Sequence, residues 1–176
     1  MSRKTVIVLA ASTLGVLIGA TFLITLMRRY PTYVQNTHDM SPTILNGATI
    51  VVRRIAGAET LSHGDLVVYE AKEVPGQSYV KRVAGLPGET VEIRAGILYR
   101  NGEAVDEPWA THELLDGFPE KLRRLEPQRD NVESLVIPED SLFLLGDDRS
   151  ISGDSRLYGP VPRSSVRGKV VSIDNP

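Results

Sequence analysis

An uncharged, mostly apolar run from Thr5 to Met27 constrains the fold of this chain more than any other stretch. At about 23 residues it is long enough for a helix to cross a bilayer with some tilt. Arg3 and Lys4 precede the run, and Arg28 follows it. We therefore expect one transmembrane helix at about residues 5–27.

A cleaved secretory signal is the competing interpretation of this run. Such a signal needs a shorter apolar region followed by a small-x-small cleavage site. Here the run ends in Met27-Arg28-Arg29-Tyr30-Pro31, which favours an uncleaved anchor. Basic residues flank both ends almost equally, so the positive-inside rule leaves the orientation open. We expect residues 1–29 to form the anchor and residues 30–176 to form the domain behind it.

Gly15 and Gly19 form a small-xxx-small pattern within the apolar run. This spacing allows close packing of two membrane helices, and a weak dimer is one interpretation. The spacing also arises by chance in apolar helices.

Beyond Arg29 the chain shows the patterns of β-strands. Thr90–Arg94 alternates apolar and charged residues, as expected of a strand with one buried face. Asn101-Gly102 is a strong hairpin signal. The other predicted strands are Ala48–Ile55, Leu66–Tyr69, the strand around Lys81, Ile97–Arg100, Ser141–Leu145 and Val166–Ile173. The sequence predicts a mainly β, antiparallel domain.

Between about residues 108 and 138 the strand pattern gives way to charge and proline. We interpret this segment as an excursion from the sheet that covers a site, with a short helix around Pro119–Leu125.

Composition excludes several classes of function. The net charge of −2 gives no reason to expect a nucleic-acid partner. The chain has no cysteine, so neither disulfides nor thiolate chemistry is available. Its three histidines, His38, His63 and His112, are scattered, which argues against a structural zinc site. We expect no cofactor and no metal.

Lys81 lies in an apolar, β-branched run, Tyr79 to Ala84, that ends in the turn Leu86-Pro87-Gly88. Against such a strand an ammonium is desolvated, which disfavours its charged form. A lysine in this state can act as a general base. The alternative is an ordinary strand lysine with its ammonium in water.

Two further blocks carry polar chemistry. The first, Thr37 to Ile44, contains Met40-Ser41-Pro42-Thr43, an extended or turn segment by its proline. The other, Gly146 to Val161, follows an apolar strand. If this block is extended, Ser152, Asp154 and Arg156 share one face, so that Asp154 and Arg156 can pair beside a hydroxyl. By itself such a block is also typical of a surface loop.

In this order and behind an anchor, the three blocks resemble the motifs of type I signal peptidases. That family carries S-M-x-P-T, then Y-[VI]-K-R-[VI]-x-G-x-P-G, then G-D-N-R-x-x-S-x-D-S-R-x-x-G. The motifs cover only about forty residues, but the last block matches at nearly every defined position. The resemblance implies an antiparallel β-sheet or partial barrel of the signal-peptidase type.

The resemblance also implies a serine endopeptidase with a Ser–Lys dyad that removes signal peptides from exported proteins. Lys81 would be the general base, and Thr37 would help to form the oxyanion hole. Ser152 would orient the lysine, and Asp154 and Arg156 would support the site. We further expect Met40, Tyr79 and Val80 to contact the substrate. The implied location is the cell membrane, with the N-terminus in the cytoplasm and the catalytic domain on the outer face.

One departure from the family motif concerns the nucleophile, because Asp39 stands at the position of the family's serine. A carboxylate would attack as a poor, already charged nucleophile and has no proton for Lys81 to remove. Its charge also favours the ammonium form of Lys81. We therefore expect a buried Asp39–Lys81 ion pair in which each partner neutralises the other.

Three smaller points concern other residues of these blocks. In an extended segment Ser41 would lie about 6.5 Å from Asp39 on the same face, too far to inherit its attack geometry. His38 is expected to face solvent. Asp148 stands where the family has an asparagine. We expect this change to remove a hydrogen bond of the turn, but it removes no catalytic group.

These observations leave more than one function open. The chain is a signal peptidase impaired by Asp39, or a non-catalytic, membrane-anchored module that binds an extended peptide as an added strand. A third interpretation is a maturation peptidase of a conjugation system, since those enzymes share the motifs.

Overall fold

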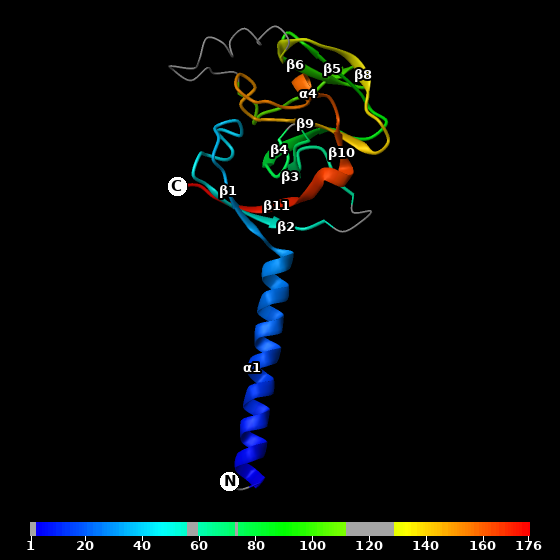
Figure 1. Ribbon diagram of the computed structural model, residues 1–176. Helices are drawn as coiled ribbons and strands as arrows, with labels where there is room; N and C mark the ends of the chain where they lie inside the picture. The colour runs from blue at the N-terminus through cyan, green and yellow to red at the C-terminus, as the bar shows by residue number, and fades with distance from the viewer. Residues whose placement is uncertain (1–2, 56–59, 73, 112–128) are drawn as a thin grey trace. The chain divides into compact units, whose positions relative to one another are not determined.

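The computed structural model in Figure 1 describes residues 3–55, 60–72, 74–111 and 129–176, with side chains of the N-terminal helix from Leu14 onward. The predicted helix at Pro119–Leu125 and His112 lie outside these residues. The chain divides into two units, Met1–Pro31 and Thr32–Pro176, which are treated separately.

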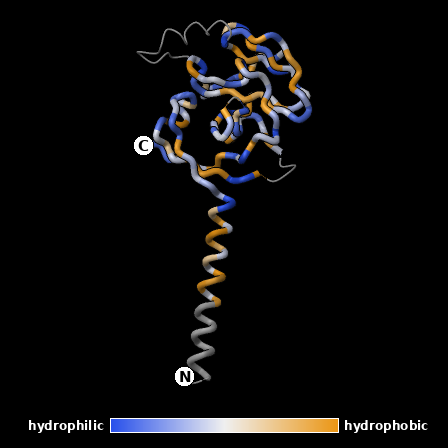
Figure 2. Tube along the Cα trace, viewed as in Figure 1, coloured by the Kyte–Doolittle hydropathy of each residue, from blue (hydrophilic) through white to orange (hydrophobic). Residues whose placement is uncertain are grey.

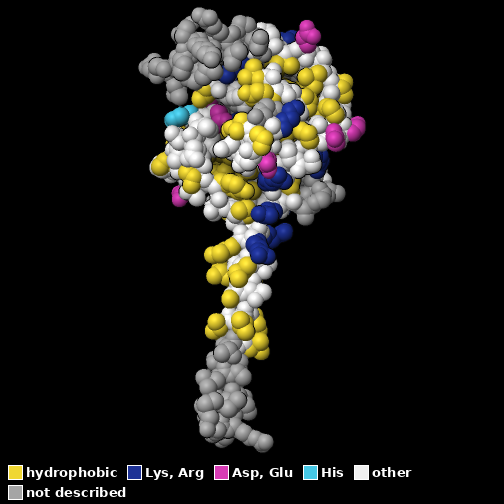
Figure 3. Space-filling view, viewed as in Figure 1, with side chains coloured by type: hydrophobic (Ala, Val, Ile, Leu, Met, Phe, Trp, Pro, Cys, Tyr) yellow, Lys and Arg dark blue, Asp and Glu magenta, His cyan; other side chains and the backbone are white. Residues whose placement is uncertain are grey.

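The first unit is built on one helix, α1 (Arg3–Arg29). From Leu14 onward its large apolar side chains are exposed, and two arginines occupy its last turn. Figure 2 colours most of the described part of the helix as hydrophobic, and Figure 3 shows apolar side chains along it. Within the described ranges, no helix is long and apolar enough to span a membrane.

The second unit consists mainly of antiparallel strands. They are β1 (Thr32–Val34), β2 (Thr49–Arg53), β3 (Leu66–Glu70), β4 (Ser78–Gly85), β5 (Thr90–Arg94), β6 (Ile97–Arg100), β7 (Glu103–Ala104), β8 (Val132–Val136), β9 (Ser141–Leu145), β10 (Val161–Pro162) and β11 (Val166–Asp174). A short helix, α4 (Ser155–Tyr158), and a 3-10 turn, η1 (Arg163–Ser165), interrupt them.

The strands form two sheets among the described residues. One has the order β1-β2-β11-β3-β4-β9-β10, and the other has the order β7-β6-β5-β8. Every strand pair in both sheets is antiparallel. The predicted mainly β, antiparallel class is therefore confirmed.

Local sequence explains most of these strands. β9 is buried along its whole length, as its continuous apolar run indicates, whereas β5 alternates buried and partly exposed residues. The β6–β7 turn has positive φ at Asn101 (52°) and Gly102 (86°), the conformation that an Asn-Gly hairpin favours. The predicted hairpin is confirmed.

The structure corrects the sequence prediction in two places. Val132–Val136 was assigned to the excursion, but it forms β8 and pairs with β5. Its partly buried residues, Val132 and Leu135, lie three positions apart because the register with β5 shifts, so the alternation that marks a strand is missing. The third polar block is not extended throughout, because Ser155–Tyr158 closes into α4.

Candidate active site

Lys81 lies on β4, between β3 and β9, where its backbone pairs with Val67. Its side chain is 1% exposed, so the predicted desolvation of this lysine is confirmed. The Nζ atom lies 5.9 Å from the centre of the Tyr79 ring, an aromatic face that favours the ammonium. A buried lysine needs a partner, and the first block supplies it.

Lys81 Nζ donates a hydrogen bond to Asp39 Oδ2, and the two side chains form an ion pair. Asp39 lies in a turn in which the amide of Ser41 donates to the carbonyl of His38. The expected Asp39–Lys81 pair is confirmed. The extended geometry assumed for Asp39 and Ser41 is wrong, because the backbone curls here rather than running as a strand.

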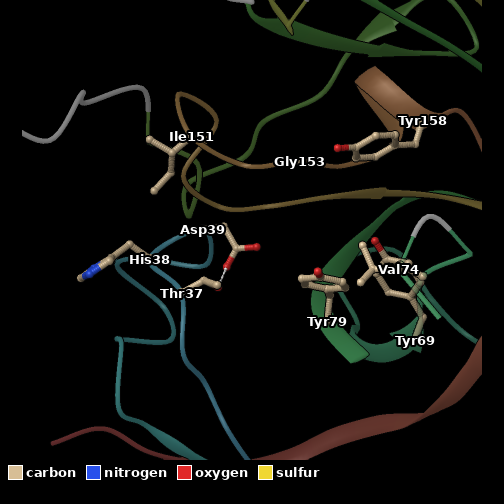
Figure 4. A pocket seen from close by; sticks show the side chains of 10 residues that line it. Thr37, His38, Asp39, Tyr69, Val74, Tyr79, Ile151, Gly153 and Tyr158 are labelled. Carbon is tan, nitrogen blue, oxygen red and sulfur yellow. Dashed lines mark hydrogen bonds between the residues drawn. The ribbon is translucent and has the colours of Figure 1, made fainter. Parts of the chain in front are cut away.

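The other carboxylate oxygen of Asp39 has two donors. Gln35 Nε2 donates to Asp39 Oδ1 at 2.8 Å, and the Thr37 hydroxyl donates to the same oxygen. Gln35 Nε2 also donates to Thr37 Oγ1 at 2.9 Å. Figure 4 shows Thr37 beside Asp39 with the bond drawn. Gln35 was missed in the sequence, where an isolated glutamine carries no periodic or motif signal.

The third block approaches the first at Gly146. The Asp148 amide donates to the carbonyl of Asp39 at 3.1 Å. A Cβ added at Gly146 would lie 2.6 Å from that carbonyl oxygen and 2.5 Å from the Cβ of Ser152. Only glycine permits this close approach.

Ser152 is fully buried, and its Oγ has no hydrogen-bond partner among the described residues. The bond from Ser152 to Lys81 that the resemblance implies is therefore not formed. The physical reason is the charge of Asp39, which attracts the ammonium more strongly than a neutral hydroxyl does.

Asp154 and Arg156 form the predicted pair. Arg156 Nε lies 2.9 Å from Asp154 Oδ1, and Nη2 lies 2.9 Å from Asp154 Oδ2, so the pair is bidentate. Asp154 also caps α4 by accepting from the Arg156 amide, and it accepts from the Gly146 amide at 3.1 Å. Burial opposes ionisation of Asp154, but Arg156 and the Gly146 amide outweigh it and lower the pKa of this carboxyl.

A third buried pair, Arg82–Asp147, was not assigned from the sequence. Arg82 Nε lies 2.8 Å from Asp147 Oδ1, and Nη2 lies 3.3 Å from Thr43 Oγ1. The Trp109 ring covers the guanidinium at 4.4 Å. Arg82 thus joins all three blocks, since Thr43 belongs to the first and Asp147 to the third. The adjacent charged residues in Lys81-Arg82 and in Asp147-Asp148 were the available signal.

Asp148 keeps a turn bond, contrary to the sequence prediction. Its Oδ1 accepts from the amide and the hydroxyl of Ser150, at 3.1 and 2.5 Å. A carboxylate accepts these donors as well as an amide oxygen does.

A pocket of about 280 Å³ opens beside Asp39 (Figure 4). Of the residues predicted to contact substrate, Tyr79 lines the pocket, whereas Met40 and Val80 do not line it and pack in a buried apolar cluster. His38 is exposed, as expected, and lies at the pocket. The remaining lining residues, mostly missed in the sequence, are Thr37, Tyr69, Ala71, Val74, Ile151, Gly153 and Tyr158.

Comparisons with known proteins agree with the motifs. The family model for signal peptidase, peptidase S26, matches residues 5–173. Signal peptidase IB of Staphylococcus aureus (strain COL) is 35% identical over 144 residues, which cover 78% of this chain and 74% of that protein. A crystal structure of a signal peptidase I from Enterococcus faecalis V583 is 30% identical, with a TM-score of 0.48 over 66% of this chain and 100% of the other. This chain belongs to the signal peptidase family, peptidase S26.

Proposed function

We propose that this chain is a membrane-anchored homologue of signal peptidase I that binds the signal-peptide end of exported proteins and does not cleave it as the sequence stands. The observation that carries the proposal is the ion pair between Lys81 and Asp39, the residue at the nucleophile's position. Restoring a hydroxyl there would return a serine endopeptidase of the Ser–Lys type.

The chemistry of the pair supports loss of cleavage. A base must be neutral to accept a proton, and an ammonium paired with a carboxylate is not. Attack by Asp39 itself would require a charged carboxylate to leave three donors and form an anhydride. Separating the buried pair leaves uncompensated charge, so the resting geometry is strongly favoured.

The peptide-binding part of the proposal rests on the pocket and on the family. Members of the family act on signal peptides of preproteins. The pocket lies between the β3–β4 region, with Tyr69 and Tyr79, and the third block, with Gly153 and Tyr158. An extended peptide can enter such a cleft with alternate side chains in pockets.

Binding without cleavage is the expected result for the unmodified chain. The assay uses a peptide with alanine one and three residues before the cut, and measures binding and product together. Ile151→Arg, at the pocket, should weaken binding. The matched control Ile97→Arg, at an exposed position on β6, should not. Efficient cleavage that is lost in Ser41→Ala would place the nucleophile at Ser41 and refute the proposal.

A maturation peptidase of a conjugation system is the second candidate, because the motifs are shared. It would bind a propeptide rather than a set of signal peptides. Competition between the two kinds of peptide for the same pocket distinguishes the candidates.

We expect the chain to remain with membranes through an alkaline carbonate wash, because Thr5–Met27 is uncharged and mostly apolar and lacks a cleavage site. We also place the N-terminus in the cytoplasm and residues 30–176 outside. Protease added to the outer face should then digest the body beyond Tyr30. Release by carbonate would contradict the anchor, and a protected body would contradict the orientation.

A further inference from the structure

The carboxylate of Asp39 is held by more than its ion pair. Lys81 donates to Oδ2, whereas Gln35 and Thr37 both donate to Oδ1. The two oxygens therefore have separate sets of donors. One set contains the base of the proposed dyad, and the other contains the hydroxyl assigned to the oxyanion hole.

Gln35 is built into this arrangement. It is 6% exposed, and its backbone is fixed by bonds to Ala48 and Gly47. Its amide nitrogen must face Asp39, because a carboxylate offers no hydrogen to an amide oxygen. One N–H then points to Asp39 Oδ1 and the other to Thr37 Oγ1.

We propose that Gln35 is an oxyanion donor of this site and that the Asp39 side chain occupies the whole reaction centre. On this interpretation Oδ2 stands in place of the serine hydroxyl and Oδ1 in place of the oxyanion. Gln35 and Thr37 are then the groups that stabilise negative charge on a peptide carbonyl once a serine stands at position 39. The inference rests on the proposed function and adds a residue to its machinery.

The reaction that Gln35 would assist is the addition of a serine to a peptide bond. The serine oxygen forms a bond to the carbonyl carbon, its proton passes to Lys81 Nζ, and the carbonyl electron pair moves to oxygen. The ester forms as the C–N bond breaks, and the leaving amine takes the proton from Lys81. Donors to the transient oxyanion lower the barrier because they bind it more strongly than the carbonyl.

The first test uses the full chain with Asp39→Ser. Adding Gln35→Leu should lower kcat about 10²–10³-fold, the usual cost of one oxyanion donor. The KM should stay unchanged, because the interaction is made only in the transition state. Gln77→Leu, at an exposed turn glutamine, is the matched control and should change neither. An unchanged kcat, or a change confined to KM, would overturn the inference.

The second test does not depend on activity. Asp39→Ala leaves the donors around a space the size of a carboxylate, so acetate should raise the melting temperature, and chloride at equal ionic strength should not. Adding Gln35→Leu should weaken acetate binding about tenfold or more, whereas Gln77→Leu should not. An acetate affinity that is the same with and without Gln35→Leu would overturn the inference.

The two tests separate this inference from the proposed function. An inert Asp39→Ser variant, combined with acetate binding that depends on Gln35, would refute the proposed return of a serine endopeptidase and support Gln35 as the donor. Normal cleavage by the Asp39→Ser, Gln35→Leu variant would support the return of a serine endopeptidase and refute Gln35 as an oxyanion donor.

Discussion

Asp39→Ser is expected to turn a chain that does not cleave into one that does. The substitution supplies a hydroxyl and removes the carboxylate that forms the ion pair with Lys81. It also frees Lys81 to meet Ser152, whose buried Oγ has no partner among the described residues. Cleavage of a peptide with alanine one and three residues before the cut, measured by product mass, tests this gain.

A base variant shows whether the gain uses the proposed dyad. Adding Lys81→Ala to Asp39→Ser should remove the activity, because losing a positioned base costs about 10²–10⁴-fold. Nucleophile and base act as a unit, so the loss can be larger. Ser41→Ala in the same background should leave cleavage intact, since Ser41 is not the nucleophile.

An Asp39→Ser variant that binds peptide but stays inert would contradict this prediction. The supporting groups would then have lost the geometry of a peptidase, and the peptide-binding module would be the better description. Activity that survives Lys81→Ala would instead exclude Lys81 as the base.

Asp154→Ala is expected to cost about 3–5 kcal/mol of unfolding free energy, because it leaves the Arg156 guanidinium buried without its counter-charge. Asp106→Ala removes an exposed carboxylate and should change stability far less. Thermal and denaturant unfolding of the full chain in detergent measure both. Equal stability of the two variants would show that the third block is a solvated loop.

A double variant and a pH series identify the origin of this loss. Asp154→Leu with Arg156→Met should be more stable than Asp154→Ala, since no charge is left unpaired. The folded-state pKa of Asp154 lies below its usual value of 3.8, so its stabilising effect is full above that pH. The effect is lost as the pH falls through the folded-state pKa. The parent's advantage over Asp154→Asn should therefore shrink in strong acid.

Local sequence was sufficient to predict several strands, one turn and one ion pair of this protein. The strands around Lys81, at Thr90–Arg94 and at Ser141–Leu145 follow from residue type and spacing, as does the Asn101-Gly102 turn. The motifs singled out Lys81, Asp154 and Arg156, and the carboxylate at position 39 predicted the ion pair with Lys81. These features depend on near neighbours or on short motifs, so a single sequence contains them.

Other features followed only from the tertiary structure. Gln35 and Arg82 acquire their roles through contacts with side chains from other turns and strands. Tertiary contacts also decide three other features. These are the Ser152 hydroxyl without a hydrogen-bond partner among the described residues, the close approach of two segments at Gly146, and the tyrosines around the pocket. Strand register and side-chain packing decide such contacts between distant segments, and periodicity along the chain does not encode them.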